Sequence, residues 1–242
     1  LIVAGDVTPD QVLALAEKTY GQIPPQPEVG AKRARPQEPV PAGPRTVTLA
    51  DPRVEQPALT RQYLVPSITT ASVGEAEAIA LLSQILGGGG TSRLHRALVV
   101  DRQIAVSAGA WYQDTALDAS QFAISAAPRP GVEFPEIERA IDEVVAKVVE
   151  HGVTDDELQR AKTQLVASTI YAQDSQFALA RWYGAALTTG QAIEDIGRWP
   201  DRVRAVTADQ VREAARVWLD KKRSVTGYLV KDNAAKSEAK RS

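Results

Sequence analysis

The sequence has no cysteine and no methionine, and only two histidines among its 242 residues. Without cysteine the chain can form no disulfide, no thiolate metal site and no cysteine nucleophile. Because methionine is missing even at position 1, we expect the chain to begin inside a longer polypeptide. Aromatic residues make up 5% of the chain and hydrophobic residues 44%, which is enough for the core of one large domain or two small ones.

Long apolar runs and an excess of basic charge are also absent. No stretch of about 18 apolar residues occurs, and no basic segment precedes an apolar one, so the sequence predicts neither a membrane span nor a signal peptide. The net charge is -2 and the sequence pI is about 5.8. Nucleic-acid binders usually present a basic face or stripe, so the composition argues against nucleic acid as a partner.

The first residues predict one strand and one helix. Leu1 to Ala4 form a short apolar run of strand character. Thr8 is a predicted N-cap with Gln11 placed to complete a capping box, and the helix should end near Gly21. One strand and one helix cannot bury a core alone, so we expect residues 1–23 to be the end of a preceding domain.

Composition divides the rest of the chain. Residues 24–44 are dense in proline and charge and predict a linker. Residues 45–230 carry regular apolar patterns and predict the main domain. Residues 231–242 form a polar tail.

The main domain alternates strand pairs with runs of helix. Period-two patterns predict strands at 45–50, 58–65, 103–112, 119–128 and 224–230. Helical periodicity and capping boxes predict helices at 75–86, around 137–149, and at 154–174, 175–190 and 207–218. This order predicts an α+β fold of two layers, in which helices pack on one face of an antiparallel or mixed sheet.

The chemistry-bearing residues form no recognisable catalytic set. His95 and His151 lie in unrelated segments, and neither belongs to an HExxH or HxxEH arrangement. A G-x-S-x-G nucleophile motif is also missing. We therefore assign no catalytic and no metal-binding residue to this chain.

Four consecutive glycines, Gly87 to Gly90, follow the helix at 75–86. A phosphate-binding loop would need a lysine before its serine or threonine and would follow a strand, so phosphate binding is disfavoured. A helix cap at Gly87 followed by a flexible hinge is the simpler interpretation.

Three stretches together resemble one known family. "LSQILGGGGTSRLHRALVVDRQIAVSAGAWY", "GVTDDELQRAKTQLVAS" and "VRAVTADQVREAARVWLDKKRSVTGYLV" are similar to the second, non-catalytic domain of the pitrilysin or insulinase-type zinc metallopeptidases. The opening "LIVAGDVTPDQVLALAEKTYGQIPPQP" resembles the end of the family's first domain running into the interdomain linker. The resemblance covers the chain from Leu1 to about Val230.

The resemblance implies one half of a clamshell that closes over an unfolded peptide. In the family a similar preceding domain carries an HxxEH zinc motif, where zinc activates water and the glutamate is the general base. This chain would then be a wall of the chamber and would be inactive alone, with zinc expected only in the catalytic domain of the same polypeptide.

The family pattern also includes an arginine and, seven positions later, a tyrosine that reach the substrate. Val99 and Val106 stand at these two positions, and Arg102 lies nearby at a different offset. An aliphatic side chain cannot stabilise an oxyanion. The resemblance therefore implies that a homologous partner subunit supplies the pair, or that the protein is wholly inactive.

The glycine run has a second interpretation within the family. A longer glycine-rich loop at the matching place in one mitochondrial member is associated with its peptide substrates. Gly87, Gly88, Gly89 and Gly90, with Arg93, are therefore candidates for the substrate groove, although the hinge interpretation is favoured and Arg93 looks structural in the family.

Two classes of function remain open at this point. The first is a substrate-enclosing domain of a zinc endopeptidase that degrades or processes peptides. The second is a non-catalytic scaffold subunit that keeps the fold for protein assembly. An intact HxxEH motif in the preceding residues would favour the first, and its loss the second; the family suggests a bacterial periplasm or cell envelope as the setting.

Overall fold

The computed structural model describes residues 1–26, 36, 39 and 41–232. Most of the predicted linker at 24–44 and nearly all of the predicted tail at 231–242 therefore lie outside the described residues. The strands are β1 (Arg45–Asp51), β2 (Ala58–Val65), β3 (Ala105–Tyr112), β4 (Ser120–Pro128) and β5 (Ser224–Lys231). The α-helices are α1 (Pro9–Lys18), α2 (Glu75–Gly87), α3 (Phe134–His151), α4 (Asp155–Ala172), α5 (Gln176–Thr188), α6 (Ile193–Ala205) and α7 (Ala208–Trp218). Three shorter helical segments are η1 (Tyr20–Gln22), the π-helix η2 (His95–Asp101) and η3 (Lys221–Arg223).

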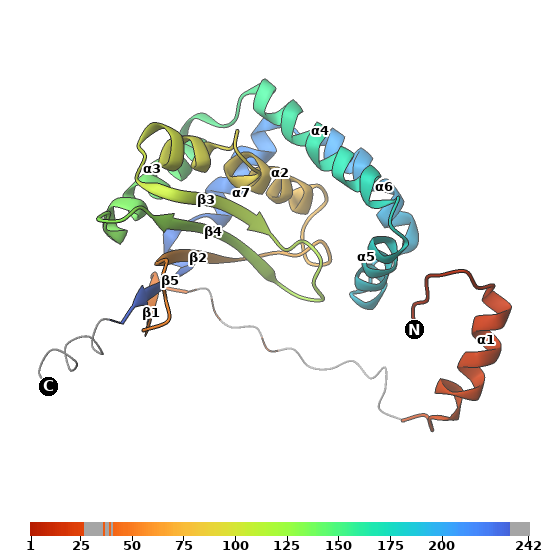
Figure 1. Ribbon diagram of the computed structural model, residues 1–242. Helices are drawn as coiled ribbons and strands as arrows, with labels where there is room; N and C mark the ends of the chain where they lie inside the picture. Colours follow the sequence, from red (N-terminus) through yellow and green to blue (C-terminus); the bar gives the residue numbers. More distant parts are fainter. Residues whose placement is uncertain (27–35, 37–38, 40, 233–242) are drawn as a thin grey trace, which may run out of the picture.

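The five strands form one mixed sheet in the order β1-β5-β2-β4-β3 (Figure 1). The pairs β2 with β4, β2 with β5, and β3 with β4 are antiparallel, and β1 runs parallel to β5. The predicted α+β class with a mixed sheet is confirmed. The last strand of the chain lies inside the sheet, between the first two.

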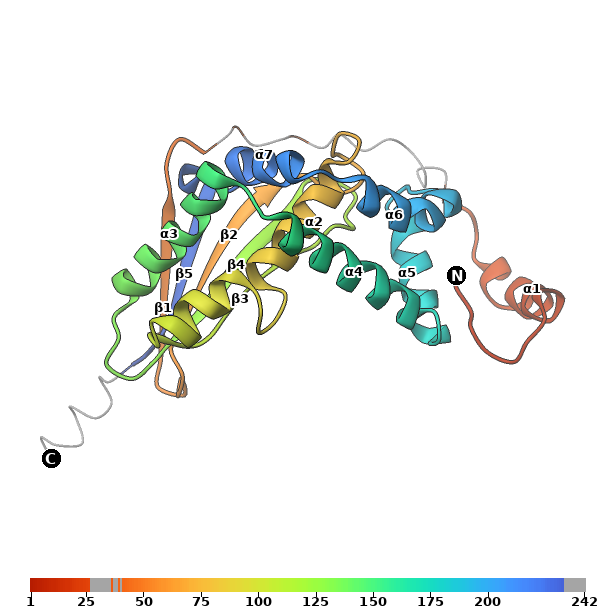
Figure 2. The same cartoon turned by 90° about the horizontal axis from the view of Figure 1, so that it is seen from above.

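Helices α2, α3 and α7 cover one face of the sheet, and α4, α5 and α6 continue beyond it (Figure 2). The core lies between these layers. Alternation along β2 directs Leu59 and Tyr63 inward, where both are at most 2% exposed, and leaves Leu64 outward. Helical spacing places Ile137 and Ile141 of α3 in the same core. Burying each such side chain stabilises the fold by about 2 kcal/mol.

The predicted helix starts are confirmed by their caps. The capping boxes are Thr8 with Gln11, Thr154 with Glu157, and Thr207 with Gln210. In each, the threonine hydroxyl accepts from the third helical N–H, and the Gln or Glu side chain accepts from the threonine N–H. These local pairs fix where α1, α4 and α7 begin.

Leu1 to Ala4 form no strand in the structure, and the strand that we expect them to form in a preceding domain stays a prediction. These residues have no strand pairing in the structure; they lie beside α5, where Ile2 would come within 2.3 Å of a Cβ added to Gly184 (Figure 1). An apolar run becomes a strand only where a sheet edge accepts its backbone, and none of the five strands does so here. The assignment of residues 1–23 to a preceding domain stays a prediction.

Candidate functional site: the open face of the sheet

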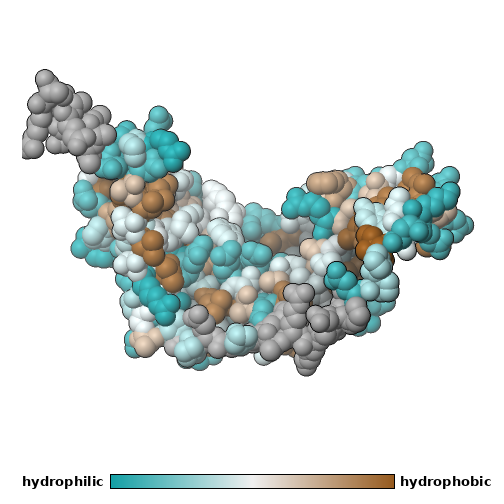
Figure 3. Space-filling model, turned by 90° about the horizontal axis from the view of Figure 1, so that it is seen from below, coloured by the Kyte–Doolittle hydropathy of each residue, from teal (hydrophilic) through white to brown (hydrophobic). Residues whose placement is uncertain are grey.

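No helix of the described residues lies over one face of the sheet (Figure 2), and we call this the open face. It is defined by the outward side chains of the five strands, as strand register and alternation place them. These residues are Val47, Leu49, Thr60, Gln62, Leu64, Ser107, Gly109, Trp111, Gln121, Ala123, Ser125, Ala127, Val225, Gly227 and Leu229. Figure 3 views the molecule from below, toward this side.

Apolar side chains on the open face are exposed on both edge strands of the sheet, β1 and β3. Val47 and Leu49 on β1 are 60% and 61% exposed, and Trp111 on β3 is 41% exposed. Small residues lie between them, such as Gly227 and Ser125. Exposed apolar side chains on an uncovered sheet face make it a candidate surface for contact with another chain.

The open face has no ionisable side chain between the strand ends. Charged residues of the five described strands on this side stand only at the termini, as Arg45, Asp51 and Lys231 do, while the middle offers hydroxyls, amides and apolar groups. Acid–base chemistry needs a titratable group near the reacting atoms. The middle of the face therefore offers no side chain for acid–base chemistry.

The glycine run closes α2 against the edge strand β3. Gly87 is the last helical residue, one later than predicted, and Gly88 is the C-cap. A Cβ on Gly87 would lie 1.6 Å from the backbone N of Ala110, so only glycine fits this contact. Gly89 has φ +106°, and both Gly89 and Gly90 are exposed with no atom near a potential Cβ. Gly87 is thus a packing residue, while the groove role of the four glycines stays a prediction.

Val99 and Val106 lie in different environments. Val99 is in the π-helix η2 and packs, half-buried, against the core. Val106 is 46% exposed at the β3 bulge that shifts the register between Ala105 and Ser107. Neither carries a hydrogen-bond donor, so these positions offer a substrate only apolar contact.

Arg93 is committed to an internal ion pair. Its guanidinium donates to both carboxylate oxygens of Glu157 at 2.8 and 2.7 Å, and to the carbonyl oxygen of Gly152 at 3.0 Å. The chain after the glycines is thereby tied to the start of α4. These contacts agree with a structural role for Arg93; its role in a substrate groove stays a prediction.

Lowering the pH should weaken the ion pair between Arg93 and Glu157. The Arg93 guanidinium, with the Thr154 N–H, lowers the pKa of Glu157 from 4.5 to about 2. A carboxyl with a lowered folded-state pKa contributes stability that is present above its unfolded pKa and lost as the pH falls through the folded one. We expect Glu157→Gln to be less stable than wild type near neutral pH, and the difference to shrink as the pH falls from 4.5 toward 2.

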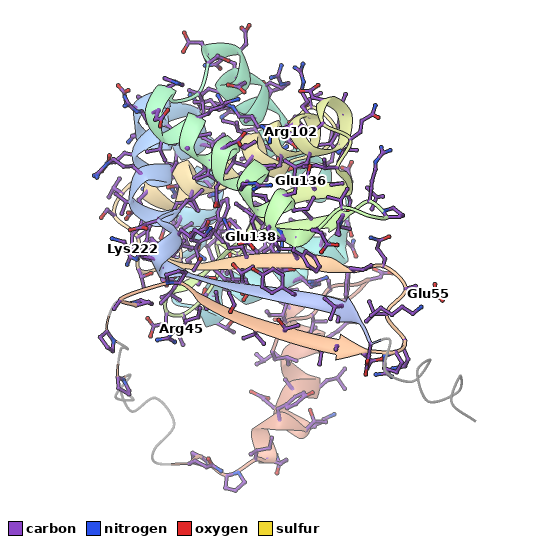
Figure 4. All side chains as sticks on the ribbon, turned by 90° about the vertical axis from the view of Figure 1, so that its left-hand side faces the viewer. Arg45, Glu55, Arg102, Glu136, Glu138 and Lys222 are labelled. Atoms are coloured by element: carbon purple, nitrogen blue, oxygen red, sulfur yellow. The ribbon has the colours of Figure 1, made fainter. Side chains whose placement is uncertain are left out.

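Urea unfolding across this pH range measures the effect. Glu55→Gln is the matched control, because Glu55 is exposed in the turn between β1 and β2 (Figure 4) and should leave the acid profile unchanged. A Glu157→Gln variant with the wild-type profile would contradict the assignment.

The chain's own residues do not fit a zinc site. His95 is in η2, and His151 ends α3 with Glu150 3.7 Å away in an exposed pair. Across the described residues, no three His, Asp or Glu side chains are grouped to hold a metal ion. No step of zinc chemistry is therefore assigned to this chain.

Comparison with known proteins identifies the family. Residues 1–165 match the family model described as the peptidase M16 inactive domain. The chain belongs to the peptidase M16 family. A zinc protease of Streptomyces coelicolor, itself uncharacterized, is 34% identical to this M16 domain over 140 residues, which are 57% of the chain and 30% of that protein.

Solved structures share the fold of the M16 domain. A protease from Helicobacter pylori superposes with a TM-score of 0.82 at 21% identity, over 93% of this chain and 54% of that one. A peptidase M16 inactive domain from Pseudomonas fluorescens gives 0.76 at 21% identity, over 95% and 53%. The first half of the periplasmic protease PqqL from Escherichia coli gives 0.72 at 15% identity, over 97% and 51%. The M16 domain thus spans about half the length of each of these chains.

Within its described part, no helix combines the length and apolar content needed to cross a bilayer.

Proposed function

We propose that this M16 domain is the non-catalytic half of a zinc endopeptidase and encloses the peptide substrate against a zinc-bearing domain that precedes it in the same polypeptide. The open face carries the proposal. Its middle has no charged side chain, its exposed side chains include Val47, Leu49, Leu64 and Trp111, and its hydroxyls and amides can bond any peptide backbone. Such a surface holds an extended chain without selecting one sequence.

The absence of reactive groups supports the same division of labour. The open face has no acid or base in its middle, and Val99 and Val106 replace the arginine and tyrosine of the family pattern. A homologous partner subunit that carries this pair would complete the site in our proposal. The M16 domain would then supply shape and burial while other parts supply the chemistry.

Site-specific photocross-linking tests the enclosure. Trp111, on the open face, is replaced with p-benzoylphenylalanine in the complete polypeptide, and a labelled unfolded peptide is added. Lys147, exposed on α3 on the helix side, receives the same replacement as the matched control. We expect cross-linking from position 111 and none from position 147. Labelling from position 147 alone, or equally from both, would overturn the proposal.

A further inference from the structure

A second feature lies at the end of the β3–β4 hairpin, away from the open face. Asp114, in the turn after β3, lines a cavity of about 120 Å³ together with Trp182 of α5 and Trp199 of α6. Thr169 of α4 and Gln191 of the α5–α6 loop complete its polar wall. Figure 1 shows this hairpin turn close to α5. Three separate segments thus bring one carboxylate and two indoles together.

The Asp114 carboxylate has no cationic partner in the described part of the chain. Its Oδ1 accepts a hydrogen bond from the Thr115 hydroxyl at 2.9 Å, and no ion pair joins it to a basic residue there. Its main chain is fixed, because the carbonyl oxygen accepts from the Ile68 N–H at 2.8 Å. The carboxylate is held in place by hydrogen bonds from the Thr115 side chain and from the main chain of Asp114 and Thr115, and none of these donors carries a charge.

Two other shielded carboxylates are neutralised by arginine. Glu77, 3% exposed, accepts from Arg202 at 2.6 Å, and Glu157 pairs with Arg93 at 2.7 Å. Asp114 has no such arginine among the described residues. Burial raises the pKa of Asp114, and the nearby Glu77 carboxylate adds to the rise, while hydrogen bonds from Thr115 oppose it. A shielded carboxylate in this state gains from a cation that enters the cavity.

The cavity walls suit an organic cation. An indole face attracts a guanidinium or ammonium group within about 6 Å. The cation–aromatic contacts of the described residues are Arg181 with Phe177 and Arg223 with Trp218, so Trp182 and Trp199 are not used in this way. Anions are disfavoured by Asp114 and by Glu77 and Asp195, which line the adjoining cavity of about 260 Å³ with Arg202.

We propose that the cavity formed by Asp114, Trp182 and Trp199 binds the side chain of a lysine or arginine. Its volume equals that of about four water molecules at ~30 Å³ each, enough for a charged group and part of its aliphatic stem. A single carboxylate gives too few ligands for a metal ion. The assignment of this side chain to a peptide rests on the proposed function, whereas the recognition of the cation does not.

Titration with single amino-acid derivatives tests the cavity independently of the open face. The 242-residue chain is titrated with N-acetyl-lysine amide and N-acetyl-arginine amide, and the tryptophan indole resonances are followed by NMR. N-acetyl-norleucine amide, which has the stem without the charge, is the matched ligand. We expect the basic probes to shift the Trp182 and Trp199 signals, assigned by Trp182→Phe and Trp199→Phe, and the neutral probe to shift neither. Equal shifts with norleucine would overturn the proposal.

A second experiment repeats the titration with the Asp114→Asn variant. The substitution should weaken binding of the basic probes by about tenfold. It should not lower the melting temperature, because it removes a shielded charge that has no cationic partner. Asp174→Asn, an equal change of charge in the exposed α4–α5 loop, should leave binding unchanged. If Asp114 only supports the fold, Asp114→Asn lowers the melting temperature and both probes bind as before. Because the probes need no open face, their binding and the cross-linking result fail independently.

Discussion

Gly87→Ala is expected to destabilise the fold by about 3 kcal/mol or more. The added methyl would meet backbone atoms of β3, with Ala110 N at 1.6 Å and Ala110 Cα at 2.5 Å. A flexible side chain could turn away, but a strand backbone moves only if the end of α2 separates from the sheet. Urea denaturation of the purified variant measures the loss.

Gly90→Ala is the matched control for this prediction. Gly90 belongs to the same run, has no atom within 4 Å of a potential Cβ and has no positive φ. Its replacement should change the stability by no more than about 0.5 kcal/mol. If Gly87→Ala and Gly90→Ala are equally stable, the four glycines act as one flexible loop and the close contact is wrong.

Arg61→Met should cost about 3–5 kcal/mol. Arg61 is on β2 beneath α3 and is 1% exposed. It donates to Glu138 at 2.9 Å, to Asp142, and to the Thr226 hydroxyl at 3.2 Å. Figure 4 shows Glu138 on the helix side of β2 and β5. Removing the buried cation leaves Glu138 and Asp142 with only the exposed Lys221 as a cationic partner, at 3.9 and 2.7 Å, and removes the ion pairs that join α3 to β2.

Two further variants define the origin of this loss. Arg53→Met removes a surface arginine whose side chain is 89% exposed and paired with Asp51, and it should cause no measurable change. Adding Glu138→Gln and Asp142→Asn to Arg61→Met should recover part of the stability, because the shielded carboxylates are then neutral and only the exposed Lys221 loses its charged partners. Thermal unfolding of the three variants measures these differences in stability. An Arg61→Met protein as stable as Arg53→Met would refute the prediction.

The sequence predicted those elements whose determinants are local. The strand β2 has the bounds that its alternation indicated, and the helices α4 and α7 begin at their predicted capping boxes. The bounds of helix α6 were not predicted: its N-cap is Ala192, which offers no side-chain acceptor, and Pro200 interrupts its pattern. Local chemistry thus predicts an element only when its start and its periodicity are both marked.

Features that depend on tertiary contact could not be predicted in this way. The apolar pattern of Leu1 to Ala4 is the same whether or not a strand edge is near, so the pattern alone does not show whether these residues pair. The need for glycine at position 87 arises from Ala110, which is distant in the sequence. Asp114, Trp182 and Trp199 belong to three segments with no common motif, so only their packing shows a cavity.

The position of β5 has a consequence for how the chain folds. Strand β1 pairs with β5 and with no other of the described strands. The first strand of the sheet can therefore pair only after the last one has been synthesised. During synthesis, β2, β3 and β4 can associate as soon as they emerge, while β1 has an unpaired backbone until residues 224–231 leave the ribosome. Contacts of such long range slow folding and leave a strand edge open to other chains. A chain that stopped at residue 165, where the family match ends, would leave this edge permanently open.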